Sequence, residues 1–264
     1  MVANMKRLSN DQILTMAPSA GAIFPLAAVS DRYSFLPTIE VVDMLRKEGW
    51  FPTVAQEVRT RKQERAGFQK HLIRLQHDNL VLGDEATECI LINSHDRSCA
   101  YQLSIGVYRF VCSNGMMVGE TFEKVSVRHM GFNPDDIIDA SYEVIENAPL
   151  IAENVNSYKG IHLGEGERLA YAASCLPLLY EDPEEAPIRP ARLLYARHSA
   201  DTGNDLWSTL NVVQENVMKG GLRAYDRRKR RITTTRAVKS IDRSVKLNKA
   251  LWTLTEKMAE LKAA

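Results

Sequence analysis

The chain has 264 residues, of which 45% are hydrophobic and 25% are charged. These fractions match those of an average folded protein and exclude a disordered chain, and the length suits one or two domains. Lys and Arg total 34 against 33 Asp and Glu, so the net charge of +1 does not by itself indicate an anionic partner.

No run of about 18 apolar residues occurs, so we expect no membrane-spanning helix. The four cysteines, Cys89, Cys99, Cys112 and Cys175, are scattered and form no C-x-x-C pair. Isolated cysteines among apolar neighbours are typical of reduced thiols in the core of a cytoplasmic protein.

The first 50 residues predict a helical segment. A short helix is expected over residues 11–16, with Ser9 or Asn10 as its cap. After a stretch broken by prolines, a second helix begins at Thr38 and ends at Gly49, where glycine favours a helix C-terminus.

Residues 50–130 predict mostly β-structure, because Val, Thr, Ile and Tyr are frequent and turn residues separate the runs. Strands are expected over 51–60, 68–76 and 88–93, with shorter pieces over 116–118 and 123–128. Residues 102–112 are apolar enough for either a strand or a short buried helix followed by a strand.

The rest of the chain predicts helices. They are expected over residues 133–159, 166–180, 205–219 and 235–262, and the three prolines of residues 181–190 predict a loop there. The fold class is therefore α+β: a small, mostly antiparallel sheet packed with helices, followed by a helical C-terminal region with a basic helix. We expect one composite domain, with an N-terminal helical segment (1–50), an α+β core (50–180) and a basic helical region (181–264).

The near-neutral total conceals an uneven distribution of charge. Residues 1–180 carry a net charge of −5, and residues 181–264 carry +6. Within residues 219–249, twelve basic residues face only Asp226 and Asp242, and a second basic cluster spans residues 59–74. Arg236, Lys239, Arg243 and Lys246 are spaced for one face of the expected last helix.

Concentrated positive charge of this kind favours a nucleic-acid partner, since arginine pairs well with phosphate and Tyr225 could stack on an unpaired base. The candidate nucleic-acid-binding residues are Arg59, Arg61, Lys62, Arg65, Lys70, Arg74, Arg223, Tyr225, Arg227, Arg228, Lys229, Arg230, Arg231, Arg236, Lys239 and Arg243. Two alternatives remain: a solvated or internally compensated basic face, and an acidic protein partner.

Catalytic signals are weaker. Cys112 and His129 suggest a nucleophile and base, but a hydrogen-bonded histidine at a strand end explains His129 more simply. The spacing of the histidines and cysteines matches no compact zinc pattern. Asp135, Asp136 and Asp139 could hold magnesium, but the first two also suit a helix start. We therefore expect a non-catalytic binding protein with no metal and no cofactor.

Two stretches resemble a known family. The segment from Tyr108 to Met116, containing Cys112-Ser113-Asn114-Gly115, and the segment from Val127 to Gly131 are similar to the signature of the domain of unknown function 932 family of phage and plasmid proteins. Leu206-Trp207, residues 236–241 and Leu251-Trp252 are similar to the C-terminal pattern of that family. The resemblance covers about residues 35–260 and implies a protein of mobile genetic elements, without an established activity.

Two classes of function follow as expectations. The first is a nucleic-acid-binding protein of a mobile element that binds single-stranded DNA through a basic groove, as in recombination or strand annealing, and forms homo-oligomers. The second is a host-interaction or anti-defence protein that binds a host protein and has no direct role at DNA.

Overall fold

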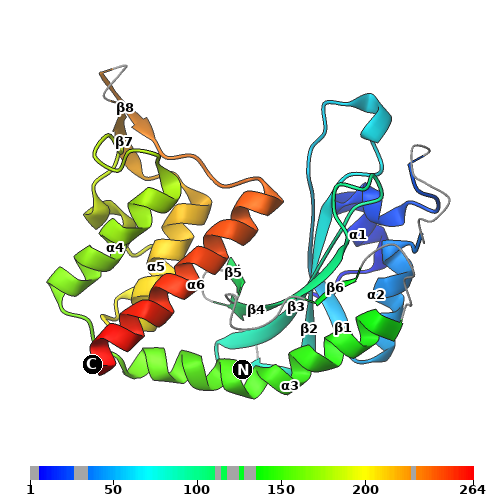
Figure 1. Ribbon diagram of the computed structural model, residues 1–264, viewed down its shortest axis with the longest axis horizontal. Helices are drawn as coiled ribbons and strands as arrows, with labels where there is room; N and C mark the ends of the chain where they lie inside the picture. Colours follow the sequence, from blue (N-terminus) through cyan, green and yellow to red (C-terminus); the bar gives the residue numbers. More distant parts are fainter. Residues whose placement is uncertain (1–5, 27–34, 111–113, 118–124, 128–134, 227–229) are drawn as a thin grey trace. The chain divides into compact units, whose positions relative to one another are not determined.

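The computed structural model describes residues 6–26, 35–110, 114–117, 125–127, 135–226 and 230–264. Over these residues the chain has the α+β fold that the sequence predicts (Figure 1). The chain forms two compact units. The first contains residues 1–110 and 121–150, and the second contains residues 111–120 and 151–264.

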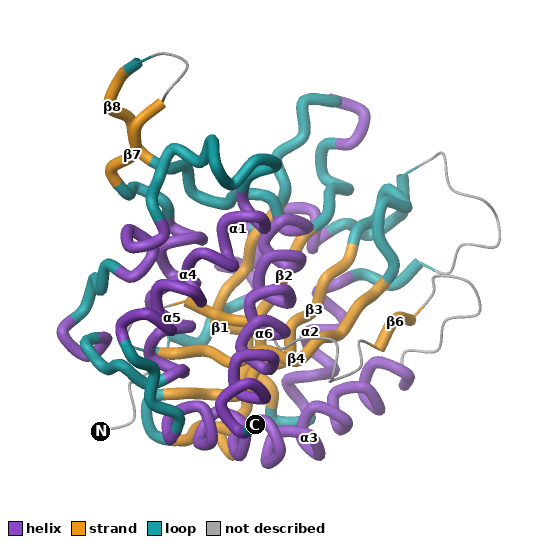
Figure 2. The backbone as a smooth tube through the Cα atoms, turned by 60° about the vertical axis from the view of Figure 1, so that its left-hand side comes forward, coloured by secondary structure: helices purple, strands orange, loops and turns teal. Residues whose placement is uncertain are grey.

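The first unit is built on an antiparallel sheet whose long strands follow one another along the chain. The strands are β1 (Trp50–Glu57), β2 (His71–Leu82), β3 (Glu85–Asn93) and β4 (Tyr101–Arg109), and β6 (Val125–Val127) pairs with β4. Figure 2 shows β2, β3 and β4 side by side. The sequence left strand and helix open for residues 102–112, and within the described part of that range β4 is strand as far as Arg109.

Two helices cover β1 in this unit. They are α1 (Asn10–Met16), followed by the short turn η1 (Pro18–Gly21), and α2 (Thr38–Lys47). Ser9, one of the two caps considered from the sequence, is the N-cap of α1: its Oγ accepts from the Gln12 N–H while Gln12 Oε1 accepts from the Ser9 N–H. The apolar residues Val41, Val42 and Leu45 of α2 are completely buried.

The second unit is helical, and the helix α5 is the one buried at its centre. Its helices are α4 (Glu165–Leu179), α5 (Leu206–Lys219) and α6 (Ile241–Ala263), together with the last residues of α3 (Asp135–Gly160). The short turns η3 (Pro190–Leu194) and η4 (Ser199–Asp201) contact α5. The backbone of β5 (Asn114–Met117) also belongs to this unit.

The core of the second unit confirms the interpretation of two tryptophans as core residues. Trp207 on α5 and Trp252 on α6 are 2% and 0% exposed, and their rings meet edge to face at 6.4 Å. Next to them, Gln214 Nε2 donates to Asn248 Oδ1 at 3.0 Å, so a polar contact also fixes α5 against α6.

The predicted start of the last helix is wrong. The expected helix over 235–262 begins only at Ile241, because Ser240 caps it by accepting from the Arg243 N–H. Upstream, the Thr235 N–H donates to the Leu222 carbonyl, and the Val238 N–H donates to the Met218 carbonyl. These bonds hold residues 235–240 in a non-helical path across α5, so Arg236 and Lys239 do not share a helical face with Arg243 and Lys246.

Among the described residues, no helix combines the length and the apolar character needed to cross a bilayer.

Candidate nucleic-acid interface

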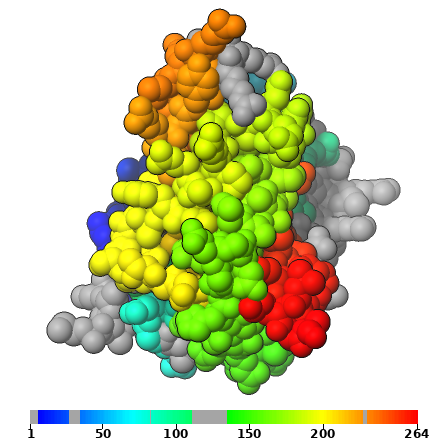
Figure 3. Space-filling view, turned by 90° about the vertical axis from the view of Figure 1, so that its left-hand side faces the viewer, coloured from blue at the N-terminus to red at the C-terminus, as the bar shows by residue number. Residues whose placement is uncertain are grey.

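The strongest candidate surface is a hairpin that the sequence analysis did not predict. β7 (Arg223–Asp226) and β8 (Arg231–Thr234) pair antiparallel, with Tyr225 opposite Ile232 and Arg223 opposite Thr234. Side chains alternate along a strand, so these four residues lie on one face, here called the outer hairpin face. All four are exposed, Tyr225 by 48% and Ile232 by 62%. The hairpin, orange in Figure 3, projects from the second unit.

A backbone bond joins the hairpin to the rest of its unit, and a second closes the base of the hairpin. The Tyr225 N–H donates to the Pro187 carbonyl at 2.8 Å, and the Gly221 N–H donates to the Thr235 carbonyl at 2.8 Å. On the opposite face Ala224 is 5% exposed. One face therefore packs on the unit, and the other presents a cation, a ring and an aliphatic side chain to solvent.

The remaining predicted residues of this region extend the positive charge beyond the outer hairpin face. Arg230 and Arg231 are exposed where β8 begins, and Arg236, Lys239 and Arg243 are exposed between the hairpin and the first turn of α6. Arg227, Arg228 and Lys229 lie outside the described residues.

A cavity of about 950 Å³ lies beside the hairpin in the same unit. Tyr180, Thr235, Arg236 and Arg243 line it, together with acidic residues that include Asp182. Its lining therefore offers an aromatic ring, hydroxyls, guanidinium groups and carboxylates. A polar planar group such as a base suits that lining better than a polyanion.

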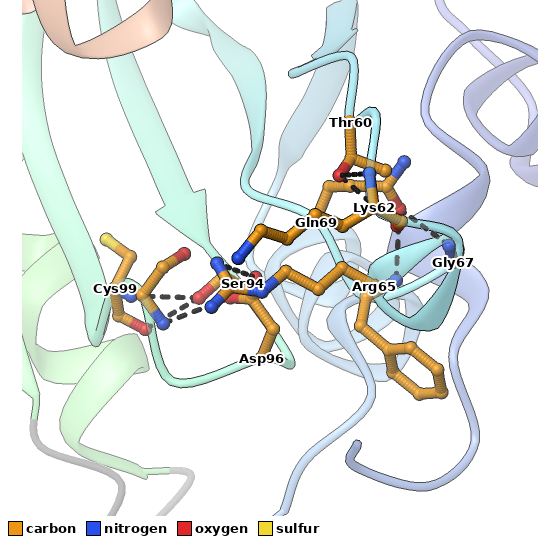
Figure 4. A network of polar contacts seen from close by, with 10 residues as sticks. Thr60, Lys62, Arg65, Gly67, Gln69, Ser94, Asp96 and Cys99 are labelled. Atoms are coloured by element: carbon orange, nitrogen blue, oxygen red, sulfur yellow. Dashed lines mark hydrogen bonds and ion pairs between the residues drawn. The ribbon is translucent and has the colours of Figure 1, made fainter.

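The second basic cluster lies in the first unit, in the loop between β1 and β2. Arg59, Arg61, Lys62 and Arg65 are exposed there, and Lys70 is half-buried. Figure 4 shows how the loop is held. Gln69 Oε1 accepts from the Gly67 N–H at 2.6 Å, and Arg65 Nη1 lies 3.7 Å from Asp96 Oδ2. The loop thus has a defined conformation with its cations on the surface.

Arg74 is placed differently from the other predicted residues. It is 8% exposed, and its Nη1 donates to Glu88 Oε2 at 2.5 Å across the β2–β3 pair. Glu88 is completely buried and also accepts from Gln76 Nε2 at 2.7 Å. Burial raises the pKa of Glu88, and the charge of Arg74 and the bond from Gln76 oppose this shift. Arg74 is therefore positioned to neutralise an internal carboxylate.

A group with the residue types of a nucleophilic triad lies buried in the first unit. Ser19 Oγ donates to Glu57 Oε2 at 2.5 Å and lies 3.2 Å from His71 Nδ1. A triad requires the carboxylate on the far nitrogen of the histidine. Here the far nitrogen, Nε2, lies 2.8 Å from Thr38 Oγ1, and the carboxylate contacts the serine. The arrangement does not have triad geometry.

The described thiols are unsuited to catalysis. Cys89, Cys99 and Cys175 are buried thiols, as the sequence predicts. Burial raises the pKa of Cys175 to about 12, which keeps its sulfur protonated and unreactive. Cys112 and His129, the pair considered from the sequence, lie outside the described residues.

One group in the second unit has the donors of a metal site. His198, Asp201 and Glu215 each place a ligand atom within 4.8 Å of the others. The sequence analysis missed this group, because Glu215 is separated from the other two by the start of α5 and no compact spacing marks it. The pair His198-x-x-Asp201, three residues apart, was the available signal.

Comparison with known proteins identifies a family and two relatives. The family described as Domain of unknown function (DUF932) matches residues 25–252. Two curated Escherichia coli K12 proteins, UPF0380 protein YfjQ and UPF0380 protein YafZ, are 34% and 33% identical over 256 residues. Each match covers 97% of this chain and 93% of the relative. No solved structure matches the chain.

Proposed function

The chain belongs to the family of unknown function DUF932, and within that family we propose that it binds nucleic acid, preferring single-stranded DNA, in the recombination or maintenance of a mobile element. The resemblance to phage and plasmid proteins supports the setting. The outer hairpin face supports the binding and is the observation that carries the proposal.

The chemistry of that face suits an unpaired strand. The exposed ring of Tyr225 offers a stacking surface, and unpaired bases stack on aromatic side chains in a sequence-tolerant way. Arg223 on the same face and Arg231 at the start of β8 supply guanidinium groups for phosphates. Exposing Tyr225 and Ile232 together on one ribbon leaves apolar surface in water, which a stacked base would cover.

Replacing Tyr225 with alanine tests the proposal. We expect Tyr225→Ala to weaken binding to a labelled single-stranded oligonucleotide by about 5- to 150-fold, which corresponds to about 1–3 kcal/mol per stacked base. Binding is measured by band shift or fluorescence anisotropy, on single-stranded and duplex DNA of the same sequence, at two salt concentrations.

Tyr195→Ala is the matched control. Tyr195 is 62% exposed in the same unit but lies outside the basic region, so its removal should leave the affinity unchanged. Equal affinities for wild type and Tyr225→Ala would contradict stacking at the hairpin. A stable complex with a host protein, without any DNA binding, would contradict the proposal as a whole.

Under the same proposal we expect a cytoplasmic homo-oligomer, because proteins that coat or anneal single strands act as several copies along the strand. Light scattering with and without an oligonucleotide measures the number of chains in the complex. A complex that contains one chain at saturating DNA would contradict this part.

A further inference from the structure

His198, Asp201 and Glu215 form a compact His–Asp–Glu cluster in the second unit, and none of them belongs to the outer hairpin face. Their ligand atoms all lie within 4.8 Å of one another. Asp201 and Glu215 are each 1% exposed, whereas His198 is half-buried. Buried carboxylates persist in folded proteins when they are paired with cations or coordinate a metal.

The local structure explains why two of the donors point the same way. His198 immediately precedes the short turn η4, and the Asp201 N–H donates to the His198 carbonyl at 3.0 Å. Side chains three residues apart are nearly eclipsed in such a turn. The turn packs against α5, which carries Glu215, so the imidazole and both carboxylates converge.

A histidine and a lysine contact Glu215 in the cluster. His198 Nε2 lies 3.0 Å from Glu215 Oε1, and Lys219 Nζ donates to the same oxygen at 2.7 Å. Burial alone would raise the pKa of Glu215, but the bonds and charges of Lys219 and His198 together lower it. Lys219 is one helical turn further along α5, and its side chain is 42% exposed, so it can withdraw into solvent.

We propose that His198, Asp201 and Glu215 bind a divalent transition metal ion of the zinc class, which takes the position that Lys219 Nζ holds against Glu215. One imidazole nitrogen and two carboxylate oxygens are a donor set that zinc and manganese accept, and three protein ligands leave a coordination position for water. The separation of 3.0 Å between His198 Nε2 and Glu215 Oε1 is close to the spacing of two ligand atoms on one zinc ion.

The segment that carries η3 and η4, yellow in Figure 3, lies on the surface of its unit, so an ion can reach the cluster through the half-buried His198. The alternative is a permanent polar cluster, in which Lys219 and His198 remain bound to Glu215 and no metal enters. The two interpretations make opposite predictions for metal binding and for the removal of Lys219.

Calorimetric titration of the full, metal-stripped chain with Zn²⁺, and separately with Mn²⁺, tests the proposal. We expect one ion to bind per chain with either metal or both, and His198→Gln to weaken that binding at least about tenfold. His162→Gln is the matched control: it also removes one histidine of the second unit, but an exposed one outside the cluster, and should leave the affinity unchanged. Equal binding by both variants would overturn the proposal, as would the absence of stoichiometric binding by the wild type.

Lys219→Met provides the second measurement. A metal that competes with Lys219 for Glu215 should bind more tightly once the ammonium group is gone, and the metal should raise the melting temperature of this variant more than that of wild type. In a permanent polar cluster the same substitution only destabilises the fold, and added metal does not restore stability. That outcome would overturn the proposal, and circular dichroism establishes that each variant is folded.

Discussion

His71 occupies the centre of a buried hydrogen-bond network that joins η1, α2 and the sheet of the first unit. Its Nδ1 lies 3.0 Å from the Gln69 carbonyl, which favours the proton on that nitrogen, so neutral Nε2 accepts from the Thr38 hydroxyl. Asn93 Nδ2 in turn donates to Thr38 Oγ1 at 3.0 Å. The ring of His95 lies 5.4 Å away, so a charge on His71 would also face a second imidazole.

The network predicts a pH dependence of stability. Burial lowers the pKa of His71 from 6.5 to about 4, so the folded chain resists a proton that the unfolded chain accepts. The contribution of neutral His71 to the free energy of unfolding is fully present above pH 6.5. About 3 kcal/mol of it is lost as the pH drops from 6.5 to about 4. Denaturant unfolding at several pH values should show this loss in wild type and a smaller loss in His71→Gln. The same pH profile in both proteins would contradict the assignment.

Arg74 and Glu88 form a charged pair whose contribution to stability also depends on burial. Arg74→Met leaves the buried carboxylate of Glu88 without its main cation and should lower the free energy of unfolding by about 3–5 kcal/mol. Arg59→Met removes an exposed arginine of the same unit and should change it little. If both substitutions have equal effects on denaturant unfolding, the Arg74–Glu88 pair does not stabilise the sheet.

At the scale of elements, the junction between α5 and the hairpin depends on two glycines. Gly220 and Gly221 have φ values of +60° and +77°, which direct the chain from the end of α5 into β7. A Cβ atom on Gly220 would lie 2.5 Å from the Arg236 carbonyl carbon, whereas a Cβ atom on Gly221 would meet nothing within 4 Å. The close approach at Gly220 brings residues 235–238 alongside the end of α5.

The two glycines therefore form a matched pair of substitutions. Gly221→Ala carries only the backbone strain, about 1–3 kcal/mol. Gly220→Ala carries similar strain and also displaces the Arg236 backbone, so it should be the more destabilising of the two in thermal unfolding. It should also weaken DNA binding by moving the hairpin. Equal melting temperatures would show that the segment around Arg236 yields to the added methyl group.

At the scale of the whole molecule, the two basic clusters that the near-neutral net charge conceals lie in different units. The exposed cations of the β1–β2 loop belong to the first unit, and those of the hairpin and the start of α6 belong to the second. If both units contact one strand, each contributes separately to the release of counterions from the phosphates.

Charge reversal in each unit measures that contribution. We compare two double variants, one in each unit: Arg59→Glu with Arg61→Glu, and Arg223→Glu with Arg231→Glu. Each should reduce the steepness of log affinity against log salt by about one for every phosphate contact removed. Arg189→Glu with Arg192→Glu makes the same charge change at exposed arginines outside the basic clusters. A control pair that lowers the slope as much as the other two would show that only net charge matters.

The sequence predicts most elements of this protein because local signals agree with the final packing. The cap at Ser9, the prolines of residues 181–190 and the apolar spacing of residues 205–219 each specify a boundary or a buried face within a few residues. The short hairpin was missed because arginines occupy its strands, and a run of charges masks the alternation that indicates a strand.

The sequence by itself determined the α+β class, the family and the positions of the basic clusters, since composition, periodicity and motifs are properties of neighbouring residues. Only the tertiary structure decided which cations reach the surface. It places Arg74 against Glu88 inside the sheet, begins the expected basic helix only after Ser240 and sets Tyr225 opposite Ile232 on an exposed ribbon. It also brings His198 and Asp201 to Glu215. Burial and pairing depend on residues distant in the chain, and no local pattern records them.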